Sequence, residues 1–193
     1  MSLILASSSP RRKEILEFFK LSFKQAKPQF DEAKLVFQHT AEDYVCELAH
    51  HKALSQKDIY PNDTILAADT LVFLDGKMLS KPVDATHAMQ MLASLSGKWH
   101  SVFTGVAVLS EGKMYSQAEE TEVCFNTLTR QQMDLYHQAF FYMDKAGGYA
   151  IQQAGSIIVK SIKGCFYNIM GLPINTTRQL LSKVGIDLWH HLK

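Results

Sequence analysis

Several features that mark common protein classes are missing from this chain. No apolar run approaches the roughly 20 residues needed to span a bilayer. The basic pair Arg11-Arg12 follows the short N-terminal apolar stretch instead of preceding it, which is the wrong order for a signal peptide. The sequence therefore predicts no membrane partner and a cytoplasmic location.

The chain also has no excess of positive or negative charge and no closely spaced cysteine pair. The 20 basic and 19 acidic residues give a net charge of +1, whereas a general nucleic-acid binder usually carries a basic excess, so no nucleic-acid partner is expected. Cys46, Cys124 and Cys165 form no CxxC pair and sit among apolar neighbours. This pattern indicates buried free thiols and argues against a cysteine metal cluster or a disulfide framework.

The short motifs of several enzyme classes are absent. The chain has no Walker-type phosphate loop, dinucleotide fingerprint, HExxH, GxSxG or calcium-binding loop. Phosphate or metal chemistry would therefore have to be built from other groups. Because no repeat, low-complexity stretch or Pro/Gly-rich linker divides the chain, residues 1–193 are predicted to form a single domain.

Helical and strand patterns alternate along the chain, with hairpins between them. Leu3–Ala6 and Thr64–Leu74 have the composition of buried strands, and Asp75-Gly76 is a strong hairpin signal. The other expected elements are helices over about 10–20, from Thr40 onward, 85–96, 130–138 and 174–184, and strands over 77–79, 99–109 and 114–128, with a second hairpin formed by 157–162 and 165–170. This alternation predicts an α/β fold with a mixed sheet and flanking helices.

The segment from Ser7 to Arg12 is the first candidate for anion binding. A buried strand leads into a serine-rich turn and a helix whose first residue is Pro10, so free backbone N–H groups and the helix dipole favour an anion. The forked guanidinium groups of Arg11 and Arg12 suit phosphate oxygens. The same residues also fit an ordinary helix cap with two solvated arginines, and the segment alone favours neither.

Two charged residues occupy positions where the pattern calls for apolar ones. Lys52 continues the helical stripe of Val45 and Leu48, so its stem is expected along the core edge with the amine reaching water, unless an anion lies there. Asp69 lies inside an apolar strand, where an ionised carboxylate must pair, bind a cation or face a cleft. For Asp69 the functional interpretation is favoured over backbone capping.

Three further positions carry less weight alone. Glu32 lies in a polar stretch that fits either a metal-facing carboxylate or a solvated loop, and the loop is favoured. Lys81 precedes Pro82, which stiffens the backbone that presents the amine. Gln152 follows two glycines that allow close approach of a ligand or merely form a turn. Taken together, the basic residues, Asp69 and Glu32 suit a polyphosphate with a divalent metal.

The order of these residues and motifs along the chain resembles that of a known family. LASSSPRR, the Phe30-Asp31-Glu32 stretch, LAHHKA, AADT, the Lys81-Pro82 step, TGVAV and DKAGGYAIQ occur in the same order as in the Maf family of nucleoside triphosphate pyrophosphatases. The resemblance implies hydrolysis of a nucleoside triphosphate to the monophosphate and pyrophosphate with a divalent metal, Mg or Mn. It also implies an α/β fold with a curved mixed sheet and a cleft between two lobes that share one core, as in inosine-triphosphate pyrophosphatases, and it allows a homodimer.

The resemblance assigns roles to individual residues. It makes Asp69 the proton acceptor, and it places Ser7, Arg12, Glu32, Lys52 and Lys81 at the other active-site positions, with Glu32 and Asp69 as candidate metal ligands. The substrate-selecting positions fall on Arg11, Thr70 and Gln152, which resemble the dTTP/UTP branch and not the 7-methyl-GTP branch. Two alternatives stay open: the same chemistry on another or modified nucleotide, and a nucleotide-binding regulator of cell division.

Overall fold

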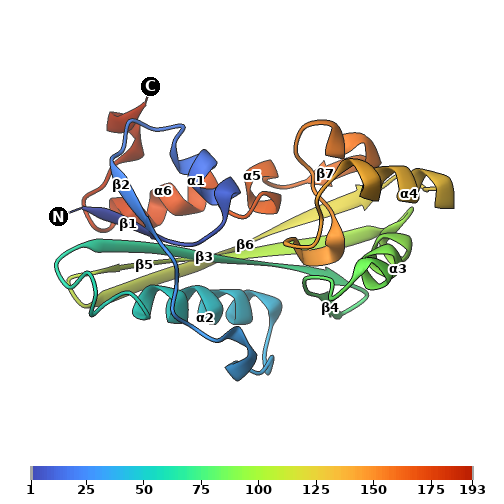
Figure 1. Cartoon of the computed structure of the whole chain (residues 1–193). Helices are drawn as coiled ribbons and strands as arrows, with labels where there is room; N and C mark the ends of the chain where they lie inside the picture. Colours follow the sequence, from blue (N-terminus) through green and yellow to red (C-terminus); the bar gives the residue numbers. More distant parts are fainter. Residues whose placement is uncertain (1, 193) are drawn as a thin grey trace. The chain divides into compact units, whose positions relative to one another are not determined.

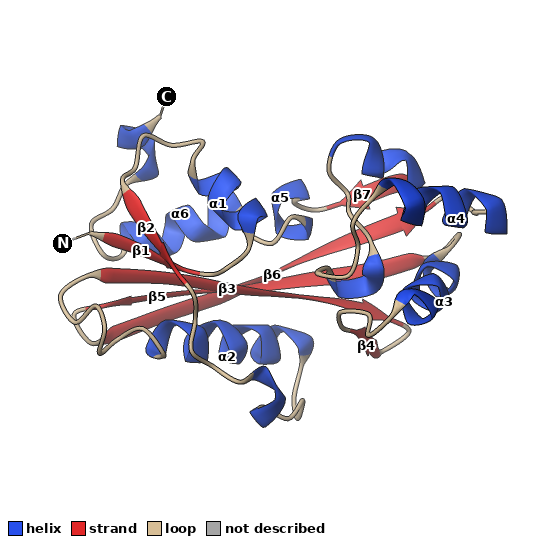
Figure 2. Cartoon of the chain, in the orientation of Figure 1, coloured by secondary structure: helices blue, strands red, loops and turns tan. Residues whose placement is uncertain are grey.

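A seven-stranded mixed sheet forms the framework of the chain, whose computed structural model describes residues 2–192 (Figure 1; Figure 2). The strand order is β2-β1-β3-β5-β6-β7, and β4 pairs with β3. The β1 strand runs parallel to β2 and β3, whereas the β3–β4 and β6–β7 pairs are antiparallel. The predicted α/β fold with a mixed sheet and flanking helices is confirmed.

The elements follow the chain in a partly alternating order. The strands are β1 (Leu3–Ala6), β2 (Phe23–Ala26), β3 (Thr64–Leu74), β4 (Lys77–Leu79), β5 (Trp99–Ser110), β6 (Lys113–Phe125) and β7 (Val159–Lys163). The helices are α1 (Pro10–Leu16), α2 (Ala41–Leu54), α3 (Ala85–Leu95), α4 (Arg130–Ala139), α5 (Phe166–Ile169) and α6 (Ile174–Ser182), with 3-10 turns η1 (Glu32–Lys34), η2 (Ala146–Gly148), η3 (Gln153–Ile158) and η4 (Leu188–His191). No helix within residues 2–192 is long and apolar enough to cross a membrane.

The described residues divide into two compact units. The first contains residues 2–69, 104–119 and 170–192, and the second contains residues 70–103 and 120–169. The chain therefore passes from one unit to the other within β3, between Asp69 and Thr70. The shared core and the cleft expected from the family resemblance stay predictions.

In the first unit, α2 packs closely against the sheet. Ala49 and Ala53 of α2 are fully buried in a cluster with residues of β1, β3 and β5. Gly105 of β5 lies against the α2 backbone, since a Cβ atom at this position would stand 2.2 Å from the carbonyl oxygen of Val45. Small residues on both surfaces thus bring the helix close to the strands, and this proximity positions the side chains that α2 directs toward the sheet.

The other side of these strands carries α1 and α6 (Figure 1). Ser9 caps α1, and Pro10 begins it as the sequence predicted. The predicted helix to Lys20 is too long, because α1 ends at Leu16 and Phe19 forms an isolated bridge with Leu192. The adjacent N–H of Lys20 donates to the carbonyl oxygen of His191 at 2.6 Å, so pairing with the C-terminal segment replaces the last expected turn.

In the second unit, most predicted elements are present at the expected positions. Asp84 caps α3 and Thr129 caps α4, and both helices begin where the sequence predicted. The predicted second hairpin is wrong, because β7 pairs with β6 and the segment after Gly164 forms the short helix α5. The backbone N–H of Cys165 donates to Thr121 Oγ1 at 3.0 Å, and this hydroxyl donates back to the Cys165 carbonyl oxygen, so a side chain satisfies the backbone in place of a return strand.

The three cysteines are free thiols, as the sequence indicated. Cys124 is buried, whereas Cys46 and Cys165 are only partly buried. Burial raises the pKa of Cys46 to about 11, so this thiol is poorly nucleophilic near neutral pH.

The close approach of α2 generates a stability prediction. We expect Gly105→Ala to destabilise the protein by an amount near the upper end of the about 1–3 kcal/mol typical of overpacking, because the new methyl group meets backbone atoms and not a flexible side chain. The melting temperature should fall by roughly 5–10 °C. The control Gln117→Ala, at an exposed position of β6, should leave it nearly unchanged. Equal melting temperatures for Gly105→Ala and the control would contradict the close packing.

Candidate active site

The ammonium group of Lys52 lies between two carboxylates. Lys52 Nζ is in direct contact with Asp69 Oδ1 and is 2.8 Å from Glu32 Oε1. The side chains of Lys52 and Asp69 are each only 9% exposed, whereas that of Glu32 is 48% exposed. Asp69 therefore has the partner that the sequence predicted, and this partner is an amine. Both side chains keep a small exposed fraction.

The position of Lys52 corrects the expectation that its amine reaches water. Lys52 continues the buried face of α2 that includes Tyr44 and Leu48, and the close approach of this helix leads the amine to the sheet. Asp69 shares a strand face with Ala67, which packs in the α2 cluster. A carboxylate thus lies at the core edge beside the amine of Lys52.

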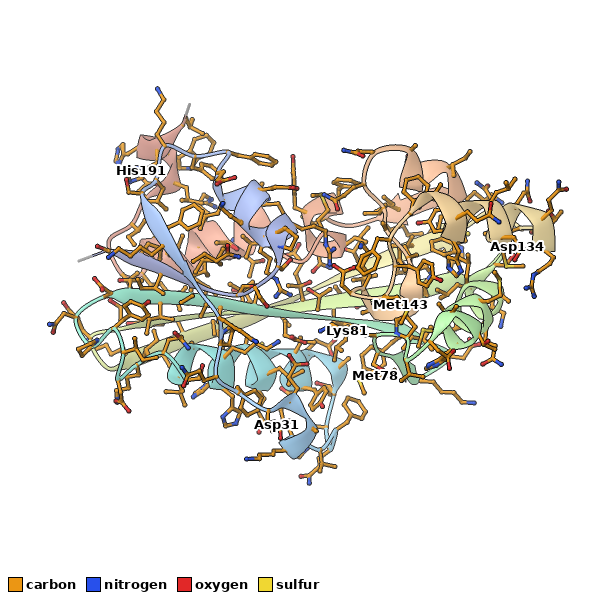
Figure 3. All side chains as sticks on the ribbon, in the orientation of Figure 1. Asp31, Met78, Lys81, Asp134, Met143 and His191 are labelled. Atoms are coloured by element: carbon orange, nitrogen blue, oxygen red, sulfur yellow. The ribbon has the colours of Figure 1, made fainter. Side chains whose placement is uncertain are left out.

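Glu32 is held by a loop fastened to α2. Asp31, labelled in Figure 3, caps the η1 turn by accepting from the N–H of Ala33 at 3.2 Å. The hydroxyl of Tyr44 donates to the carbonyl oxygen of Leu35 at 3.0 Å, and the Phe37 ring meets Tyr44 edge-on. Glu32 therefore lies in an exposed turn, as the loop interpretation expected, but its carboxylate also pairs with Lys52.

Tyr44 is a residue that the sequence reasoning missed. Burial raises its pKa, and the negative charges of Asp69 and Glu32 raise it further. Its hydroxyl therefore stays protonated and able to donate to the loop. Its spacing of eight residues before Lys52 on the same helix face was the available signal.

Ser7 and Arg12 form a second element of the site. Ser7 is buried at the end of β1, and its Oγ accepts from Arg12 Nη1 at 3.2 Å. Arg12 Nε donates to the carbonyl oxygen of Gly171 at 2.7 Å, which fixes the plane of the guanidinium group. Arg12 is therefore not a solvated arginine on a capped helix, because its side chain is held by specific partners.

The electrostatics link Arg12 to the acids. Burial lowers the pKa of Arg12, the negative charge of Asp69 raises it, Arg11 lowers it and Glu32 raises it. The guanidinium group thus lies within the electrostatic field of both carboxylates, although Arg retains its charge at any ordinary pH. Ser7, Arg12, Glu32, Lys52 and Asp69 together form one charged cluster inside the first unit.

The other predicted residues occupy different places. Arg11 lies in the first turn of α1, partly buried. Thr70, Lys81 and Gln152 belong to the second unit, where exposed Lys81 follows β4 (Figure 3) and Gln152 precedes η3. Because successive strand residues point to opposite faces, the side chains of Thr70 and Asp69 face away from each other. The substrate-selecting roles of these residues stay predictions.

The donor set fits a divalent cation that is shared with a substrate. Among residues 2–192, no group of three or more His, Cys, Asp or Glu side chains is arranged to hold a metal ion. Glu32 and Asp69 nevertheless offer two carboxylates that already share one cationic group. Mg²⁺ commonly binds through one or two carboxylates together with substrate phosphates, so this pair suits such a metal better than a closed protein cage.

Comparisons with known proteins identify relatives of this chain. Curated relatives called dTTP/UTP pyrophosphatase include one from Chlamydia caviae, 44% identical over 98% of this chain and 97% of its own length. One from Clostridium tetani is 40% identical over 97% of this chain and 100% of its own length.

Among solved structures, the Staphylococcus aureus Ham1 protein aligns at 13% identity and a TM-score of 0.49, covering 95% of this chain and all of its own. The family profile described as Maf-like protein matches residues 2–184. This match over nearly the whole chain, together with relatives of 40% identity or more, shows that the chain belongs to the Maf family.

Proposed function

We propose that this protein hydrolyses dTTP and UTP to the nucleoside monophosphate and pyrophosphate. The observation that carries the proposal is the contact of a buried carboxylate, Asp69, with the ammonium group of Lys52 beside Glu32 and Arg12. Its curated relatives, which align with nearly the whole chain, are called dTTP/UTP pyrophosphatases, and these names support dTTP and UTP as substrates. Such a cluster of fixed cations and a sequestered acid suits the attack of water on a triphosphate.

Asp69 is the group proposed to take the proton. A water molecule would attack one of the two phosphorus atoms of the α–β bridge, forming a new P–O bond while the bridging P–O bond breaks. The electron pair of the broken bond goes to the leaving phosphate group, and the proton of the water goes to Asp69. General base catalysis of this kind contributes typically 10²–10⁴-fold. Lys52 contacts Asp69 directly and so fixes the position of this carboxylate.

The fixed cations are proposed to bind the phosphate oxygens. Arg12 is oriented by Gly171 and Ser7, so little reorganisation is required when charge develops in the transition state. Each charge-assisted hydrogen bond contributes about 1.5–3 kcal/mol. The family resemblance is the ground for proposing Lys81 as a further active-site residue.

A divalent metal, Mg or Mn, is proposed to bind with the nucleotide. Glu32 and Asp69 would hold it together with phosphate oxygens, and when bound it neutralises negative charge on the phosphates. Because Lys52 occupies the space between these carboxylates, the free protein already carries a positive charge where a metal would lie. The metal is therefore expected to bind weakly without nucleotide.

Substrate choice is proposed to depend on Arg11, Thr70 and Gln152, the positions that match the dTTP/UTP branch. The family resemblance is also the ground for proposing a homodimer, and we propose a cytoplasmic location. In the alternative of a nucleotide-binding regulator of cell division, hydrolysis is incidental or absent, so an Asp69→Asn protein would still produce the cellular phenotype.

A nucleotide panel with Asp69→Asn tests the proposed activity. We expect the wild-type protein with Mg²⁺ or Mn²⁺ to cleave dTTP and UTP in preference to ATP, GTP and 7-methyl-GTP, releasing pyrophosphate. Asp69→Asn should lower kcat by roughly 10²–10⁴-fold because the proton acceptor is lost. The control Asp75→Asn removes an exposed carboxylate of the β3–β4 turn and should retain the wild-type rate. Release of orthophosphate, or full activity of Asp69→Asn, would refute the proposal.

Metal binding to Lys52→Met tests the competition between Lys52 and a cation. Without nucleotide, we expect Mn²⁺ to bind Lys52→Met at least about tenfold more tightly than the wild type, because removal of a neighbouring positive charge is worth several kcal/mol at an effective dielectric constant near 20. Free Mn²⁺ can be measured by electron paramagnetic resonance. Lys98→Met, which removes an exposed partner of Asp75, is the matched control. Equal Mn²⁺ affinity of all three proteins would argue against a metal at Glu32 and Asp69.

A further inference from the structure

Two buried side chains of the second unit hold the segment that leads to Gln152. Tyr136 of α4 and His100 of β5 are nearly inaccessible to solvent, and neither has a part in the chemistry described above. Both hydrogen-bond to consecutive residues of the sequence Gly147-Gly148-Tyr149-Ala150-Ile151-Gln152. The inference drawn from them rests on the proposed function, because it concerns how the nucleotide base is selected.

Tyr136 binds the backbone of a single residue twice. Its hydroxyl donates to the carbonyl oxygen of Ala150 at 2.5 Å and accepts from the N–H of Ala150 at 2.9 Å. Burial raises the pKa of Tyr136 to about 12, so the hydroxyl keeps the proton that it donates. Because both backbone groups of Ala150 are bound to one oxygen atom, the position and direction of the chain are fixed two residues before Gln152.

His100 holds the preceding residue by a neutral contact. His100 Nε2 is hydrogen-bonded to the hydroxyl of Tyr149 at 2.9 Å, and the rings of His100, Tyr149 and Phe125 pack edge-on against one another. Burial lowers the pKa of His100 to about 4, so the imidazole is neutral at physiological pH. The contact is therefore unsuited to proton transfer near neutral pH and suited to fixing the position of Tyr149.

The two ends of the segment are tied as well. The N–H of Gly147 donates to the carbonyl oxygen of Ser80 at 3.2 Å, directly before Lys81. Gly147 has a φ of 72°, and a Cβ atom there would lie 3.2 Å from Val72 Cγ2, so glycine is required at this turn. Beyond the segment, the N–H of Gly155 donates to the carbonyl oxygen of Gln152 at 2.9 Å. Hydrogen bonds therefore hold both ends of the segment, at Gly147 through Ser80 and at Gln152 through Gly155.

We propose that Tyr136 and His100 are positioning residues for base selection, acting through Ala150 and Tyr149 to fix the point from which Gln152 reaches the pyrimidine. Uracil and thymine present an N–H donor beside a carbonyl acceptor, whereas cytosine presents the opposite pattern at the same edge. A primary amide can pair with either pattern by turning over. Discrimination therefore depends on a surrounding frame that fixes the amide, because a site built for one hydrogen-bond pattern rejects the other only when its groups cannot adapt.

The test compares Tyr136→Phe with the wild type on UTP and CTP. Tyr136→Phe retains the buried ring and removes both bonds to Ala150. We expect KM for UTP to rise and the ratio of kcat/KM for UTP over CTP to fall at least fivefold. The inhibition constant of pyrophosphate, which lacks a base, should stay within twofold of the wild-type value. Tyr115→Phe, which alters a partly buried tyrosine of the first unit, is the matched control and should change none of these values.

A second pair of variants separates positioning from general stability. His100→Phe should lower the UTP-over-CTP ratio, and His100→Gln, which retains a hydrogen-bonding group of similar reach, should restore at least part of it. Hydrogen exchange should show faster exchange of the Ala150 amide in Tyr136→Phe than in the wild type. A parallel loss for all nucleotides and for pyrophosphate would show a merely structural role and overturn the proposal.

The outcomes also separate this inference from the proposed function. If the wild type cleaves dTTP and UTP but Tyr136→Phe leaves the UTP-over-CTP ratio unchanged, the inference is wrong and the function stands. The inference is equally wrong if the wild type cleaves UTP and CTP alike. If the wild type cleaves neither dTTP nor UTP, the proposed function itself is wrong.

Discussion

The buried contact between Lys52 and Asp69 constrains the first unit more than any other interaction. Each charge lies in an element that is otherwise apolar on its inner side, and an isolated charge there would lose its hydration without compensation. Removing one partner of a buried pair typically costs about 3–5 kcal/mol. Helix and strand must therefore lie close enough for the two groups to meet. Gly105 and the alanines of α2 allow this close approach. The contact between Lys52 and Asp69 therefore depends on the packing of small residues.

The same contact helps to hold positively charged groups in fixed positions before a substrate binds. Lys52 is held by two carboxylates and Arg12 by Ser7 and a backbone carbonyl, so both cations have a fixed direction in the free protein. Fixed dipoles and charges require little reorganisation when negative charge develops, which makes them more effective than solvated side chains.

The sequence predicted the parts of the structure that depend on local signals. Caps at Ser9, Thr40, Asp84 and Thr129 and the Asp75-Gly76 turn are set by residues that lie next to each other in the chain, and these elements are present as expected. The errors occur where distant residues decide. Phe19 pairs with Leu192, and Thr121 binds the backbone of Cys165. The β2 strand was missed because Phe23–Ala26 is short and half-exposed and is a strand only through its pairing with β1. Likewise, periodicity placed Lys52 on an inner face, but only the fold shows Asp69 and Glu32 at its amine.

The residues proposed to bind phosphates in the first unit are charged, whereas those proposed to position Gln152 in the second unit are neutral. The first unit gathers ionised groups, and these suit phosphates because charge-assisted hydrogen bonds to phosphate oxygens are stronger than neutral ones. In the second unit, the residues that hold the approach to Gln152 are neutral: a tyrosine that keeps its proton and a histidine that stays uncharged above about pH 4. The choice between two pyrimidines depends on where hydrogen-bond donors and acceptors lie. Neutral buried anchors fix those places without adding a field that acts on every nucleotide.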